Sequence, residues 1–210
     1  PGPLVSMTVE RFVDEVSSSS PAPGGGSVAA LAGSLGAALA AMVANLTVGK
    51  KGYEAAWTSS SALAERAQAL KAALLAAVDD DTKAFDDVLA AMRLPKATDA
   101  EKAARADAIA AAYEKATSVP LATARLCLQA IELAEEAART GNRNSASDAG
   151  VGALLAKAGL EAAILNVRIN LPSVREGAFK AATLAEIAQL QQKSAGPLAK
   201  TLEAVEASLK

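Results

Sequence analysis

The chain has 210 residues and a formal net charge of −2, and its composition is 51% hydrophobic but only 3% aromatic. It contains no histidine and a single cysteine, which excludes histidine-based triads and an internal disulfide and argues against a catalytic zinc site. No basic stretch is interleaved with aromatic residues, so nucleic-acid binding is not expected.

Alanine supplies much of the hydrophobic content, and alanine has the highest intrinsic helix propensity. Runs of β-branched and aromatic residues, which are typical of strands, are nearly absent. No internal repeat or linker divides the sequence, so we predict one all-α domain, a bundle of long antiparallel helices. Residues 1–6 precede Met7 and are interpreted as a tag remnant or a disordered extension, which leaves residues 7–210 as the domain.

Residues 8–17 predict a short amphipathic helix, and a loop rich in Ser, Pro and Gly follows it. The uncharged residues 27–49 then predict the central, Ala/Gly-rich helix of the bundle, whose small residues would let another backbone approach closely. This stretch is long enough to span a bilayer, but its Ala, Gly and Ser content favours a helix buried among other helices, including those of a second subunit. Its larger apolar residues recur at helical spacing: Val28, Leu31, Leu35, Leu39, Met42 and Leu46.

Prolines, glycines and a capping pattern delimit the remaining helices. Thr98 and Glu101 form a capping box, Pro120 is expected to kink or divide the helix that follows, and Gly141 ends it. The predicted segments are residues 58–92, residues 98–140 with Pro120 inside, residues 148–170, and two helices after Pro172.

Asp81 is the first polar residue that stands where an apolar one is expected. At about 100° per residue, Asp81 falls within the apolar stripe of the helix over residues 58–92, whereas Asp80 and Asp87 point the other way. A lone carboxylate on a buried face is costly unless it is paired or neutralised. Asp81 is therefore a candidate site residue, and a buried structural ion pair is the alternative.

Asp148 and Asn166 fall on one face of the helix over residues 148–170, among small residues, and Asn170 lies close by. This arrangement is typical of the wall of a polar cleft. The alternative for Asp148 is an N-cap role, which Ser145 could fill equally well.

The glycine-rich loop before residue 27 exposes backbone amides at a helix N-terminus, which suits an anionic group. No Gly-Lys-Ser/Thr follows the glycines, so this is not a Walker motif. A flexible connector is the alternative.

Five stretches occur in one order along the chain. They are PAPGGGSVAALAGSLGAALAAMVANLTVGKK (Pro21–Lys51), DDDTKAF (Asp79–Phe85), LPKATDAEKAARADAI (Leu94–Ile109), VPLA (Val119–Ala122), and GNRNSASDAGVGALL through NVRINL (Gly141–Leu171). Together they resemble the cyclodeaminase/cyclohydrolase family of tetrahydrofolate enzymes. The resemblance implies an all-helical homodimer that needs no metal or cofactor. No signal peptide precedes the first helix, so we expect the protein to lie in the cytoplasm and to bind no membrane.

The family has two activities. One closes 5-formimidoyltetrahydrofolate to 5,10-methenyltetrahydrofolate and releases ammonia, and the other opens the methenyl bridge with water to give 10-formyltetrahydrofolate. The stand-alone length and the LPKATDAEKAARA stretch favour the cyclohydrolase, with the cyclodeaminase as the alternative. A non-catalytic helical oligomer with a degenerate site is the second alternative.

The resemblance also implies roles for individual residues on a folate substrate, with or without a polyglutamate tail. Asp148 would act as a general base or stabilise the methenyl cation, Lys96 would donate a proton or a hydrogen bond, and Asp81 would orient Lys96 or share its proton chemistry. An exposed loop lysine is the alternative for Lys96. The candidate substrate-binding residues are Gly24, Gly25, Gly26, Ser27, Lys50, Asn142, Asn144 and Asn166.

Overall fold

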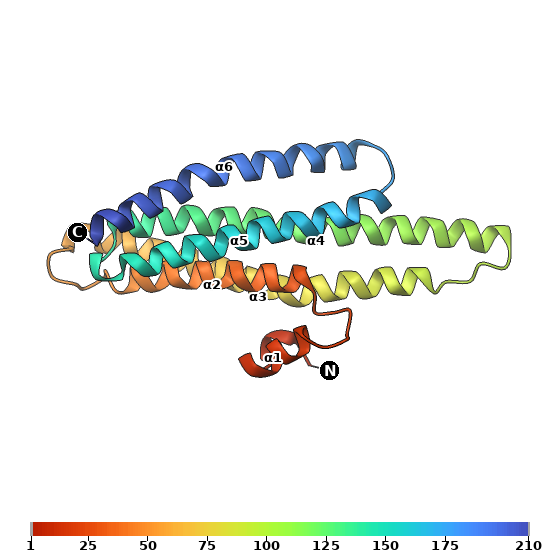
Figure 1. Cartoon of the computed structure of the whole chain (residues 1–210), viewed down its shortest axis with the longest axis horizontal. Helices are drawn as coiled ribbons and strands as arrows, with labels where there is room; N and C mark the ends of the chain where they lie inside the picture. Colours follow the sequence, from red (N-terminus) through yellow and green to blue (C-terminus); the bar gives the residue numbers. More distant parts are fainter. Residues whose placement is uncertain (1, 210) are drawn as a thin grey trace.

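The computed structural model describes residues 2–209 and confirms the all-α prediction. Figure 1 shows α2 to α6 side by side in one elongated bundle, with the short α1 set apart from it near the N-terminus. Short 3-10 turns occupy most of the connections. The α-helices are α1 Val9–Val16, α2 Gly25–Asn45, α3 Trp57–Met92, α4 Asp99–Thr140, α5 Ala146–Asn170 and α6 Ala178–Ser208.

The close contact between α2 and α5 is made by small residues. A Cβ added to Gly36 would lie 2.6 Å from the Gly152 carbonyl oxygen, and one added to Gly159 would lie 2.7 Å from that of Ala29. The two backbones are therefore nearly in contact, as the small residues of α2 predict. Ala29 near the start of α2 meets Gly159, and Gly36, later in α2, meets Gly152, earlier in α5. The two helices are therefore antiparallel.

The predicted stripe of larger apolar residues on α2 lies at or near the surface of the chain, whereas Val43, outside this stripe, is buried. Leu35 is 48% exposed and Leu46 is 49% exposed, whereas Ala37, Ala40 and Ala41 are buried. The prediction of a central helix is confirmed, because α2 packs against α3, α4 and α5. Its stripe of large side chains, however, does not face the core of this chain.

Two predicted breaks are absent from the structure. Pro120 does not divide α4, and one helix, α6, replaces the two expected after Pro172 even though it contains Pro197. In α4 the carbonyl that Pro120 leaves without a helical donor, that of Ala116, accepts a hydrogen bond from Asn170 Nδ2 at 2.8 Å. Tertiary contacts therefore offset the local cost of a proline inside this helix.

The first residues lie against α3. The turn η1, Leu4–Ser6, packs on that helix, and the Leu4 amide donates to Asp79 Oδ1 at 2.6 Å. Whether residues 1–6 are a tag remnant stays a prediction, and residue 1 lies outside the described part of the chain.

Two segments, α2 and residues 143–173, are long and apolar enough to cross a membrane. In the bundle, 61% of the α2 window and 50% of the other window are buried. Helix packing accounts for much of their apolar composition.

We expect Gly36→Ala to destabilise the fold by about 1–3 kcal/mol, because its methyl group would force α2 away from α5. Gly196→Ala in α6 is the matched control, since a Cβ there meets no atom within 4 Å. Alanine is favoured over glycine in a helix by about 0.5–1 kcal/mol, but Pro197 disfavours a Cβ on the helical residue before it, so the control should destabilise the fold less than Gly36→Ala does. Urea unfolding measures both, and equal stability of the two variants would contradict the close packing.

Candidate functional site

A polar cleft of about 290 Å³ opens where α2 begins. The loop before α2 forms one edge, and α3, α4 and the last turn of α5 complete the walls. The cleft combines one carboxylate and two carboxamides with apolar side chains. Its lining includes Gly24, Gly25, Asp81, Phe85, Val88, Tyr113, Ala116, Asn166, Ile169 and Asn170.

Asp81 projects from α3 against the first turn of α2. A Cβ on Gly26 would overlap the Asp81 carboxylate, so this approach requires glycine. Ser27 Oγ lies 3.3 Å from Asp81 Oδ2 and 2.8 Å from the Val78 carbonyl oxygen. Burial raises the pKa of the Asp81 carboxyl above its usual range, and hydrogen bonds from Ser27 oppose this rise in pKa without cancelling it.

Ser27 is the polar partner of the Asp81 carboxyl. A serine hydroxyl has one proton, and the Val78 carbonyl oxygen is nearer to Ser27 Oγ than Asp81 Oδ2 is. Asp81 itself is half-buried on the predicted apolar stripe of α3, and no salt bridge to Asp81 occurs among residues 2–209.

Asn166 faces the same helix start from α5. A Cβ on Gly25 would lie 3.2 Å from Asn166 Nδ2, and Nδ2 donates to the Ala162 carbonyl at 2.9 Å. Consecutive glycines thus let Asn166 and Asp81 approach the same turn from two sides. The structure brings together six predicted site residues here: Gly24, Gly25, Asp81 and Asn166 line the cleft, while Gly26 and Ser27 lie against Asp81.

The remaining candidates on α5 and the preceding loop lie at the opposite end of the bundle. Asp148 and Asn166 are 18 residues apart on one helix, which corresponds to about 27 Å. The Asn142 amide donates to Thr47 Oγ1 at 2.8 Å, and Asn142 Oδ1 accepts from the Asn144 amide at 3.1 Å. These bonds fix the loop beside the end of α2, where Lys50 also lies.

Lys96 is exposed in the loop between α3 and α4. Asp81 stands 11 residues before the end of α3, which is about 16 Å along the helix, and Figure 1 shows the α3–α4 hairpin extending beyond the other helices. Asp81, Lys96 and Asp148 therefore do not converge within one chain. In particular, Asp81 does not orient Lys96.

The sequence prediction missed two aromatic cleft residues, Phe85 and Tyr113, because both resemble ordinary core positions. The sequence places Asn170 beside the predicted polar wall, one helical turn after Asn166, and in the structure Asn170 lines the cleft.

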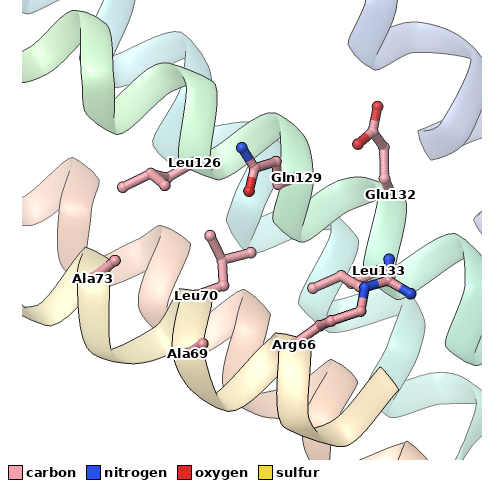
Figure 2. Close-up of a pocket in the computed structure, with 8 residues that line it drawn as sticks. All are labelled: Arg66, Ala69, Leu70, Ala73, Leu126, Gln129, Glu132 and Leu133. Carbon is pink, nitrogen blue, oxygen red and sulfur yellow. The ribbon is translucent and has the colours of Figure 1, made fainter. Parts of the chain in front are cut away.

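A second groove, of about 400 Å³, runs between α3 and α4 (Figure 2). Its walls include Leu70, Leu126 and Leu133, and Arg66 at its edge pairs with Glu136 at 3.0 Å. None of the predicted site residues lines this groove. Across residues 2–209, Asp, Glu and Cys side chains form no group of three that could hold a metal ion.

Comparison with known proteins identifies the scaffold. A family model described as formiminotransferase-cyclodeaminase matches residues 8–189. The chain belongs to this family. The family resemblance seen in the sequence is therefore confirmed.

Relatives carry both names that the sequence suggests. The chain is 47% identical over 180 residues to a methenyltetrahydrofolate cyclohydrolase of Methylorubrum extorquens, covering 86% of each chain. It is 38% identical over 204 residues to the formimidoyltransferase-cyclodeaminase of Sus scrofa, but it spans only 38% of that protein's length. The crystal structure of a formiminotetrahydrofolate cyclodeaminase from Thermotoga maritima superposes with a TM-score of 0.87 at 28% identity, over 98% of both chains.

Asp81→Asn should change how stability depends on pH. Because the folded pKa of Asp81 is raised, its contribution to stability is present below the unfolded pKa and is lost as pH rises through the folded pKa. Asparagine cannot ionise, so we expect the stability of Asp81→Asn relative to wild type to increase as pH rises above the unfolded pKa of about 4.

Urea unfolding across this pH range measures the effect. Asp80→Asn is the control, because it removes only an exposed pair with Lys83 and should change stability by less than about 1 kcal/mol. A relative stability of Asp81→Asn that is constant with pH would contradict the buried environment of this carboxyl.

Proposed function

We propose that this chain is a methenyltetrahydrofolate cyclohydrolase, which adds water to 5,10-methenyltetrahydrofolate to give 10-formyltetrahydrofolate. The observation that carries the proposal is the 47% identity, over 86% of both chains, to a protein of that name. The cleft around Asp81 supports it, because this cleft is built from the family's glycine-rich block, its aspartate-rich stretch and its NVRINL segment.

The reaction needs one group that accepts a proton and one that supplies a proton. Water attacks the cationic methenyl carbon and loses one proton to a base. The bond from this carbon to N5 then breaks as N5 takes up a proton, and the hydroxyl of the adduct loses its proton as the formyl group forms. The net result is one proton released.

Asp81 suits the proton-supplying step. Burial raises the pKa of its carboxyl, which brings its proton exchange closer to neutral pH, and a protonated Asp81 can donate to N5 and can then regain a proton from the hydroxyl of the adduct. The cyclodeaminase reaction would use the same donor for the departing ammonia. Asp148 remains our candidate for the base, although it lies about 27 Å away along α5.

A homodimer would resolve this separation. Exposed apolar residues cover adjoining faces of α2 and α5, and a patch of this kind on a folded protein marks an interaction surface. The residues of this patch are Val28, Leu35, Met42 and Leu46 on α2, and Val151, Leu154, Leu165 and Ile169 on α5. Ile169, which is 75% exposed, also lines the cleft, so the patch reaches the edge of the site.

A two-fold axis through the middle of the patch would place the α5 start of each subunit beside the cleft of the other. Eighteen residues make five full turns at about 100° each, so Asp148 and Asn166 point in the same direction from α5. In such a dimer, Asp148 of the partner subunit would face Asp81 across the cleft. Lys50 of the partner subunit would then be available to a glutamate tail of the substrate.

The same proposal includes a role for Lys96, a location in the cytoplasm and activity without added cofactors. Lys96 lies outside the cleft in this chain.

Assaying both folate substrates side by side tests the function. We expect faster loss of methenyltetrahydrofolate absorbance than release of ammonia from 5-formimidoyltetrahydrofolate, and Asp81→Asn should slow turnover on the order of 10²-fold. Faster ammonia release would make the chain a cyclodeaminase. Turnover of neither substrate would leave a helical oligomer with a degenerate site.

Mixed dimers test the shared site. Asp81→Asn and Asp148→Asn subunits, co-expressed with different tags and purified over both columns, give dimers that retain one intact site of two. We expect each parent to be nearly inactive and the mixed dimer to have about half of the wild-type activity, as two-fold symmetry requires. A mixed dimer as inactive as its parents would show that each site lies within one chain.

A further inference from the structure

The proline inside α4 creates a free acceptor beside the cleft. Pro120 has no N–H, so the Ala116 carbonyl four residues earlier loses its helical donor. Asn170, the last residue of α5, supplies the missing donor through Nδ2 at 2.8 Å. Both Ala116 and Asn170 line the cleft that contains Asp81.

This bond fixes the orientation of the Asn170 carboxamide. Only the amide nitrogen can donate to a carbonyl, so Nδ2 faces Ala116 and Oδ1 is directed away from it. Within residues 2–209, no N–H or O–H group donates to Oδ1 of Asn170 or of Asn166, whose own Nδ2 is bonded to Ala162. Each carboxamide therefore keeps its full acceptor capacity and one remaining N–H.

The chemistry of this end of the cleft favours one kind of ligand. Two carboxamide oxygens supply acceptors, while the side chains of Phe85, Val88 and Ile169 supply apolar walls. A flat ring that carries several N–H donors on one edge matches both features. The aminopyrimidine edge of a reduced pterin is such a group, since its 2-amino group and N3–H are adjacent donors.

We propose that Asn170 binds the aminopyrimidine edge of the substrate, with Oδ1 accepting a hydrogen bond from the 2-amino group. Pro120 is a positioning residue, which acts through the Ala116 carbonyl. The inference rests on the proposed function in taking a reduced folate as the ligand. N5 lies on the other ring of the pterin, so holding the pyrimidine edge at Asn170 leaves N5 free to face Asp81.

Asn170→Ala removes the acceptor and tests the contact. The ring is bound in the ground state and in the transition state alike, so we expect KM to rise about tenfold, with kcat changed by less than about twofold. The second readout is discrimination against a methenyl substrate whose 2-amino group is replaced by methyl. Wild type should reject this analogue, and Asn170→Ala should reject it about tenfold less strongly.

Gln189→Ala is the matched control, because it removes an exposed carboxamide on α6 and should alter neither KM nor discrimination. A purely structural Asn170 would give a different result. Asn170→Ala would then lower the free energy of unfolding while KM and discrimination stayed at wild-type values, and this outcome overturns the proposal.

Pro120→Ala tests the positioning role separately. Alanine restores an N–H that can bond the Ala116 carbonyl within α4, which releases the Asn170 carboxamide without removing it. We expect KM to rise and discrimination to fall in the same direction as in Asn170→Ala, while the far-ultraviolet circular dichroism stays at the wild-type value. Unchanged KM and discrimination in Pro120→Ala would show that the proline does not position Asn170.

Calorimetric binding of tetrahydropterin, which lacks the folate side chain, separates this inference from the proposed function. If wild type turns over neither folate substrate but binds tetrahydropterin more tightly than Asn170→Ala does, the proposed function fails and the inference stands. If turnover is normal and the two proteins bind tetrahydropterin equally, the inference fails and the function stands.

Discussion

The near-contact of α2 and α5 is the constraint on which the rest of the structure depends. Glycines at positions 36, 152 and 159 leave room for backbone rather than side chains between the helices. Bringing these backbones together excludes large side chains from the shared interior, so those of α2 must face outward. The same packing therefore creates both the compact interior and the exposed apolar patch, and it sets the start of α2 beside the end of α5, where the cleft lies.

Glycines at the start of α2 also create the space in which the cleft residues meet. Gly25 and Gly26 begin α2 without side chains, so Asn166 and Asp81 approach that turn closely from α5 and α3. A carboxyl held at this depth loses hydration, and its pKa rises. Thus the glycine-rich block contributes to the site mainly by leaving space for other residues. The structure gives no reason to regard it as an anion-binding loop.

The sequence predicts most of the fold because helical periodicity and capping are local. Thr98 and Glu101 form the predicted capping box, and the apolar stripe places Asp81 correctly. One predicted break is absent because a distant contact decides the outcome: the Ala116 carbonyl finds its donor 54 residues away in Asn170, so α4 continues through Pro120. Likewise, helical periodicity predicts that Asp148 and Asn166 share one face of α5. It does not predict which end of α5 lies near Asp81.

Two of the family's motifs, the glycine-rich block and the GNRNSASDAG loop, lie far apart in one chain. A site assembled within one chain would gather the glycine-rich block and the GNRNSASDAG loop at one end of the bundle, yet α2 and α5 hold them at opposite ends. Because α2 and α5 share an apolar face, a two-fold axis through this face in the proposed dimer would bring the two motifs together from different subunits. Dimerisation would then be a requirement of the chemistry as well as a means of burying the patch. The proposed arrangement also leaves Asn170 and Asp81 together in one subunit, so ring binding and proton supply would depend on a single chain, and only the base would come from its partner.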